Sequence, residues 1–327
     1  MSQQIDHAMV DILMPTYKPD LYLLERAIKS IKSQTFQQWR LYLIENGGST
    51  ISDDFISALN DQRIVYKNLE SKGKPNALNY ALTISGSRHI AYLDDDDIWF
   101  PNHLSDVLSA LQTQCSNFVF SDAYEVMIDR TGNTFRETGR RNLSRGVITE
   151  KTLWYISHIN VIHTRDLVVS SGAYDDSRSY FIDWDMLQRM AQIERPYHLK
   201  KFTCEHYIYL DSSQKKTNTI SSQHLSDPAK SKQMHDDMFR RAFSLLTPDD
   251  FVDIAKDTQE KIRLIENLEK TRDGAQLSME KNQEVAQLKT TIADLEKAVA
   301  DLKSSYSWRI TKPLRSIFDL TRRLASH

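Results

Sequence analysis

Short apolar runs alternate with one-sided helical patterns along the first third of the chain. Four apolar runs have strand length and stop at turn or polar residues: 10–15, 41–44, 63–66 and 90–93. Between them, apolar residues recur at helical spacing over three segments: 21–33, 55–59 and 76–84. Strands and helices that alternate at this spacing are typical of a mostly parallel sheet with helices on both faces. We therefore expect an α/β fold.

The pattern continues less regularly further along the chain. It predicts helices over 103–111 and 186–191, strands over 117–121 and 159–163, and loops or a hairpin over 122–150. After about residue 221 the composition changes. We therefore expect one large catalytic domain over residues 1–225 and a helical connector over 226–258.

A helical arm is predicted after this connector. Residues 255–305 contain no proline and a single glycine, and their charges alternate in sign. Near the end of this segment, apolar residues alternate spacings of three and four: Val285, Leu288, Ile292, Leu295, Val299 and Leu302. This seam predicts a coiled-coil-like helix over 259–305, although Thr271 and Gly274 break the register upstream. Such an arm could bind another copy of the chain to form a homo-oligomer, or it could bind a partner enzyme.

Residues 306–327 form a basic amphipathic segment. Asp319 is the single acidic residue of this segment. Five residues are basic: Arg309, Lys312, Arg315, Arg322 and Arg323. Apolar residues fall on one face of a helix that Pro313 can start. A helix of this kind is expected to contact the surface of the inner membrane. The alternative is a helix that docks on the catalytic domain or on a partner enzyme.

The overall composition narrows the function classes. A net charge of −2 creates no general attraction to nucleic acid, so we expect no nucleic-acid partner. Cys115 and Cys204 are the only cysteines, which argues against a disulfide framework or a structural zinc site. The first residues lack the order of a secretory signal, and no stretch approaches the roughly 20 apolar residues that cross a bilayer. We expect a cytoplasmic protein.

Polar clusters follow three of the predicted strands: 16–17, 45–46 and 94–97. In open parallel sheets, ligands bind outside the carboxyl ends of the strands, so these clusters are expected at one ligand-binding edge. The four aspartates of 94–97 repel one another unless something neutralises them. A divalent cation shared with substrate phosphates is one interpretation, and a solvated helix-capping loop is the other.

A series of short motifs follows these elements in a fixed order: VDILMPTY at 10–17, SQTF at 33–36, ENGGS at 45–49, GKPNALN at 73–79, YLDDDDIWFP at 92–101, GAYD at 172–175 and IDWD at 182–185. The series resembles family 2 glycosyltransferases of the GT-A fold over about residues 9–220. The resemblance implies a Rossmann-like α/β fold. It also implies a nucleotide-sugar donor and a glycan or lipid-linked acceptor in surface-polysaccharide synthesis, such as O-antigen or capsule assembly.

The resemblance also assigns roles to residues. Asp94 and Asp96 would hold Mn²⁺ or Mg²⁺, and Asp183 would be the general base of an inverting transfer. The nucleotide sugar would be bound by a larger set: Pro15, Thr16, Tyr17, Glu45, Asn46, Gly73, Lys74, Asn79, Asp94 and Asp95. Lesser candidates are Asp97 and His206 for the metal and Trp99 and Trp184 for stacking on a sugar.

Each role has a structural alternative. Lys74 could be a solvated lysine, Tyr17 and either tryptophan could be core residues, and Asp183 could cap a helix. Two departures from the family pattern also matter. Asn46 stands where relatives carry a second carboxylate, which leaves the base preference open, and Ile182 replaces the usual glutamate.

Two other function classes agree with parts of the pattern. A scaffold could bind nucleotide sugar without turnover and recruit partners through the helical arm. A metal-dependent phosphohydrolase would release its product without an acceptor. The presence of Asp94, Asp96 and Asp183 together favours the transferase.

Overall fold

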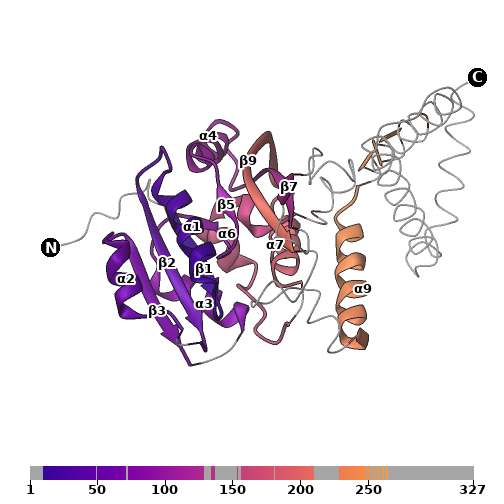
Figure 1. Cartoon of the computed structure of the whole chain (residues 1–327). Coiled ribbons are helices and arrows are strands. Elements are labelled where there is room, and N and C mark those ends of the chain that lie inside the picture. Colours follow the sequence, from indigo (N-terminus) through magenta and orange to yellow (C-terminus); the bar gives the residue numbers. More distant parts are fainter. Residues whose placement is uncertain are drawn as a thin grey trace, which may run out of the picture. The chain divides into compact units, whose positions relative to one another are not determined.

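The computed structural model (Figure 1) describes residues 10–48, 50–70, 73–128, 134–136, 153, 156–179, 181–209 and 228–247. These lie in one compact unit that spans 1–143 and 147–247. A second unit spans 144–146 and 248–327, and the structure describes helical positions of it at 249, 250, 253, 254, 256, 257, 260 and 263. The predicted coiled-coil-like helix, apart from positions 260 and 263, and the predicted basic tail lie outside the described residues.

A single sheet contains the strands of the described residues, in the order β3-β2-β1-β4-β8-β6-β9-β5, with β7 paired to β6. The strands are β1 (Val10–Thr16), β2 (Trp39–Asn46), β3 (Ile64–Leu69), β4 (His89–Tyr92), β5 (Ile98–Trp99), β6 (Phe118–Ile128), β7 (Thr134–Arg136), β8 (Val161–Thr164) and β9 (Tyr197–Tyr209). The first four are parallel to one another. Beyond β4 the sheet is mixed, because β8 is antiparallel to β4 and β6, β9 is parallel to β6, and β5 is antiparallel to β9.

Helices cover both faces of the sheet. The helices are α1 (Leu21–Lys32), α2 (Asp53–Leu59), α3 (Lys74–Ile84), α4 (His103–Thr113), α6 (Arg165–Ser170), α7 (Ile182–Ile193) and α9 (Pro228–Ser244), with a short 3₁₀ turn, η1 (His158–Asn160). Side chains alternate across β1, so Ile12 and Met14 pack with α1 and α4 on one face. Leu13 packs with α3, α6 and α7 on the other face. The expected α/β class is confirmed.

The second half of the sheet departs from the predicted pattern. The hairpin expected within 122–150 exists as β6 and β7, but the sequence pattern missed β9. Two register shifts in the β6–β9 pairing, on either side of Asp122, interrupt the alternation of inward and outward side chains. Lys200 and Lys201 are both exposed, whereas residues 203–205 are all buried, so no two-residue period is visible.

The polar clusters meet at one edge of the sheet, as expected. Thr16, at the end of β1, pairs in register with Glu45 near the end of β2. The Leu93 amide donates to the Leu13 carbonyl at 3.3 Å, so the acidic loop leaves β4 beside the end of β1. The Thr16 hydroxyl donates to the Asp95 carboxylate. The ends of β1, β2 and β4 therefore place Thr16, Glu45 and the acidic loop side by side.

Candidate active site

The acidic loop at 94–97 is held from three sides. Its contacts are a hydrogen bond from the Thr16 hydroxyl to the Asp95 carboxylate, one from the Arg26 guanidinium to the Asp96 carbonyl, and one of 2.7 Å from the Tyr207 amide to the Asp97 carboxylate. Arg26 also lies over the Tyr207 ring, 3.9 Å from its centroid. The loop is therefore fixed to α1, β1 and β9. Asp97 is buried and bonded to the chain, which suits a structural role better than metal binding.

Lys74 faces the acidic loop from the start of α3. Gly73 precedes it with φ of +118°, a conformation that favours glycine, and Pro75 lies in the first turn of the helix. The Lys74 ammonium donates to Asp94 Oδ1 at 2.7 Å, with about a third of its side chain exposed. Burial lowers the pKa of Lys74, but the carboxylates of Asp94, Asp183 and Asp96 outweigh burial and raise it. Lys74 therefore stays charged and lies among these carboxylates.

Asp183 stands in the first turn of α7 and is half-buried. Its Oδ1 accepts a hydrogen bond of 3.0 Å from the following main-chain amide, that of Trp184. Burial raises the pKa of Asp183, Lys74 lowers it, Asp94 raises it, and the balance lies above the ordinary value. These mutual effects place Asp183 within electrostatic range of the Lys74–Asp94 pair. A carboxyl with a raised pKa is a better proton acceptor than an ordinary aspartate.

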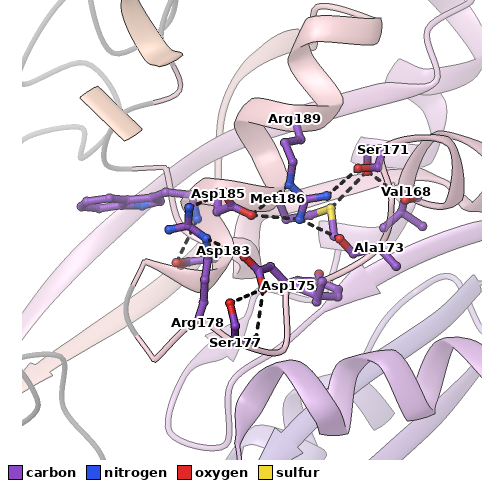
Figure 2. A network of polar contacts seen from close by, with 12 residues as sticks. Val168, Ser171, Ala173, Asp175, Ser177, Arg178, Asp183, Asp185, Met186 and Arg189 are labelled. Atoms are coloured by element: carbon purple, nitrogen blue, oxygen red, sulfur yellow. Dashed lines mark hydrogen bonds and ion pairs between the residues drawn. The ribbon is translucent and has the colours of Figure 1, made fainter. Parts of the chain in front are cut away.

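The loop before α7 ties these residues together. Asn79, on α3, donates from Nδ2 to the Tyr174 carbonyl at 2.8 Å and accepts from the Tyr174 amide at 2.9 Å. Arg189, on α7, donates to the carbonyls of Ser171 and Ala173. Figure 2 shows the α7 end of this network. Asn79 thus joins the helix that begins with Lys74 to the loop that leads to Asp183. This is a positioning contact rather than a contact that needs a nucleotide.

The loop after β2 depends on Glu45. This carboxylate is fully buried and accepts hydrogen bonds from the Thr50 amide and hydroxyl, both at 2.7 Å, and from the Tyr66 hydroxyl at 2.6 Å. Burial alone would raise the pKa of Glu45, but these bonds outweigh it and lower the pKa. A Cβ at Gly48 would clash with the Glu45 carboxylate, so a side chain at this position would displace Glu45 from its hydrogen bonds. Glu45 therefore shapes the loop that follows the buried Asn46 at the end of β2.

Sequence reasoning missed His158, which is fully buried beside the site. Its ring stacks on Tyr92 with centroids 4.4 Å apart, and Tyr174 lies edge-on to it. Burial and, to a smaller extent, the nearby Lys74 lower the pKa of His158 to about 3, so the imidazole is neutral. His158 lies in a 3₁₀ turn outside every motif, and its local sequence gives no indication of this position.

The structure also decides between some alternatives for the aromatic candidates. Trp99 is a core residue: it is 2% exposed, stacks on His103 and donates from Nε1 to the Ile159 carbonyl. Trp184 stacks on Phe181 and packs beside Met234 and Met238 of α9. Tyr17 is partly exposed, with the Lys18 ammonium 5.4 Å from its ring centroid.

The acidic loop suits a metal that the substrate completes. Among the described residues, no three side chains of His, Cys, Asp or Glu gather as a full protein-built metal site would require. Mg²⁺ commonly takes only one or two carboxylates together with substrate phosphates and water. Asp94 is partly exposed next to the buried Asp96, and both offer hard oxygen ligands. His206 lies on β9, and the described residues place no such group around it.

This curled α/β sheet with an acidic loop at its edge is the GT-A fold of glycosyltransferases. It resembles two structures of *Staphylococcus aureus* TarS residues 1–349. With the UDP-GlcNAc complex the TM-score is 0.52 at 12% identity, covering 88% of this chain and 92% of TarS. With the UDP complex it is 0.50 at 13% identity, covering 61% and 60%.

Sequence comparisons identify more specific similarities than the fold does. Residues 11–167 match the model of glycosyl transferase family 2. An *Escherichia coli* relative, UDP-Glc:alpha-D-GlcNAc-diphosphoundecaprenol beta-1,3-glucosyltransferase WfgD, is 31% identical over 38% of this chain and 48% of its own length. The *E. coli* glucosyltransferase WfaP, of the same description, is 30% identical over 36% and 46%. The chain thus spans about half the length of these curated relatives.

Within the described residues, no helix combines the length and apolar character needed to cross a bilayer.

Proposed function

We propose that this protein is an inverting glycosyltransferase that moves a sugar from a nucleotide-diphosphate sugar to a hydroxyl of a glycan or lipid-linked acceptor. The observation that carries the proposal is the position of Lys74. Its ammonium bonds Asp94 at 2.7 Å and lowers the pKa of Asp183, so the acidic loop and the proposed base lie within electrostatic range of one another. The proposal assigns the donor to the ends of β1, β2 and β4 (the donor side) and the acceptor to the start of α7 (the acceptor side).

On the donor side, the nucleoside diphosphate would lie against Lys74 and the acidic loop. The Lys74 ammonium is a charged donor for a phosphate oxygen, and its ion pair with Asp94 keeps it in place before the donor binds. Asp94 and Asp96 would hold Mn²⁺ or Mg²⁺, which neutralises charge on the departing diphosphate when bound. Pro15, Thr16, Tyr17 and Asn46 would surround the nucleoside.

On the acceptor side, Asp183 would remove the proton from the acceptor hydroxyl. The oxygen forms its bond to the anomeric carbon while the bond from that carbon to the diphosphate oxygen breaks on the opposite face. The proton ends on the Asp183 carboxylate, and the nucleoside diphosphate leaves with the electron pair. A single displacement of this kind inverts the anomeric centre. The raised pKa of Asp183 suits this role.

The relatives suggest which substrates to test first. The names of WfgD and WfaP specify UDP-glucose and a diphosphoundecaprenol-linked GlcNAc, and the TarS complexes contain UDP or UDP-GlcNAc. We propose that the donor is a UDP-sugar and that the acceptor is a diphospholipid-linked glycan in cell-surface polysaccharide synthesis. We further propose that the protein acts at the cytoplasmic face of the inner membrane. Residues 306–327 would contact the membrane surface, and residues 259–305 would bind another copy of the chain or a partner enzyme. Apart from positions 260 and 263, these two segments lie outside the described residues.

A donor screen tests the proposal. The full chain is incubated with UDP-, GDP- and dTDP-sugars, Mn²⁺ or Mg²⁺, and a GlcNAc-diphospholipid, and nucleoside diphosphate and glycosylated lipid are measured. We expect release that requires the acceptor and that EDTA abolishes. Full activity after exhaustive metal removal would refute the metal assignment.

Release without acceptor would instead indicate a phosphohydrolase. Donor binding without turnover under every condition would indicate a scaffold.

A further inference from the structure

α9 follows the catalytic motifs in the sequence, yet it packs on the turn that carries Asp183. Met238 and Ala242 of α9 are fully buried against Phe181, and Met234 and Trp184 complete this cluster. None of the motifs that define the family domain includes α9, and the family match ends at residue 167. The contact therefore adds a second support to the start of α7.

The start of α7 needs such support because its backbone is strained. Phe181, the residue before the helix, has φ of +54° and ψ of +36°, the left-handed region that a bulky residue rarely adopts. No side chain caps the helix at this position. Strained residues of this kind persist only where their surroundings fix them. Stacking on Trp184 and burial beside Met238 supply those surroundings.

A charged contact joins the same two helices. The Asp185 carboxylate, two residues after Asp183, is buried and bound by three arginines. Arg178 and Arg189 come from the preceding loop and from α7 itself, and Figure 2 shows both with Asp185. The third, Arg241, reaches Asp185 from α9. A buried carboxylate that loses one of its partners is costly, so this pair holds α9 and α7 in register.

We propose that α9 sets the position of the Asp183 carboxylate and that Arg241 is the positioning residue. Arg241 fixes Asp185, and the apolar cluster fixes Phe181, so α9 restrains the first turn of α7 from both sides of Asp183. The inference rests on the proposed function for its catalytic consequence. Its structural part, the restraint of residues 182–185, can be measured without any substrate.

The test compares Arg241→Met with Arg240→Met in the full chain. Arg240 neighbours Arg241 on α9, but its side chain is 78% exposed and, within the described residues, its ion pair is with Asp237 at 3.4 Å. Hydrogen exchange of the amides of residues 182–186 is measured on both variants without ligands. Turnover is measured with UDP-glucose, or with the sugar nucleotide that the donor screen selects. Arg241→Lys is included because a lysine can restore the charge.

We expect Arg241→Met to speed exchange in the first turn of α7. It should lower kcat about tenfold, since small misplacements of reacting groups are costly in rate, while the donor KM stays unchanged. Arg241→Lys should recover part of kcat, and Arg240→Met should match the wild type. Wild-type kcat in Arg241→Met overturns the proposal. A loss of kcat without faster hydrogen exchange also overturns it. A loss of kcat that is accompanied by a higher donor KM does the same. If the wild type itself turns over no donor, the proposed function fails, while the exchange data still decide whether α9 restrains α7.

Discussion

The two halves of the sheet differ in how they build the candidate site. In the first half, β1, β2 and β4 are parallel, and their polar ends come together simply because the strands are neighbours. In the second half, the strands are mixed, and Asp183 reaches the site through a loop, a strained helix start and contacts between distant segments. The donor side thus follows from local patterns, whereas the acceptor side depends on tertiary contacts.

The largest effect is expected from Asp183→Asn on the acceptor side. The amide cannot accept the proton, so kcat should fall by about a thousandfold, within the range that general base catalysis supplies. Donor binding, measured by calorimetry, should be retained because the donor side is unchanged. Asp176→Asn, an exposed aspartate of the same loop, is the control and should keep wild-type turnover. A kcat within threefold of wild type in Asp183→Asn would remove the base assignment.

A smaller effect is expected from Lys74→Met, which removes the charge between the two sides. The diphosphate loses a cationic partner and Asp94 loses its ion pair, so kcat/KM should fall about a hundredfold, equivalent to roughly 3 kcal/mol of transition-state stabilisation. Lys29→Met provides the matched control, because Lys29 is an exposed lysine on α1. An unchanged kcat/KM would make Lys74 a structural residue only.

The pH dependence of kcat should identify the base. Asp183 must be deprotonated to act, so turnover falls as the pH drops through its pKa, about tenfold per pH unit. Because burial raises this pKa, the fall should begin at a higher pH than for an exposed aspartate. The profile is measured at saturating donor and metal. A profile that stays flat down to about pH 4, the ordinary range of aspartate, contradicts the assignment.

The smallest effect on turnover is expected from Glu45→Gln on the donor side. This substitution should instead lower the stability of the fold. The amide cannot accept all the hydrogen bonds that the carboxylate accepts from Thr50 and Tyr66. We expect a loss of about 2 kcal/mol in the free energy of unfolding, measured by urea denaturation. Glu25→Gln, in an exposed ion pair with Lys29, should cost almost nothing. Equal midpoints for the two variants would contradict this role of Glu45.

The contrast between the halves also explains what the sequence could predict. The alternation of apolar runs and the residues after each run predicted β1 to β4 and the acidic loop, because these features depend on neighbours in sequence. The roles of Asn79 and Glu45 were not predictable. Both residue types suit ligand binding, and only the contacts with Tyr174 and with Thr50 show what they do. His158 and Arg241 were missed for the same reason, since their partners lie far away in the sequence.

The bond between Asn79 and Tyr174 has a consequence for how the enzyme family could diversify. Both of its hydrogen bonds go to main-chain atoms, so the spacing between α3 and the α7 loop does not depend on which side chains the loop carries. Residues 175–177 of that loop are exposed. Their identities can therefore change, and with them the surface that the loop presents, while the contact that joins the helix of Lys74 to the loop before Asp183 is kept.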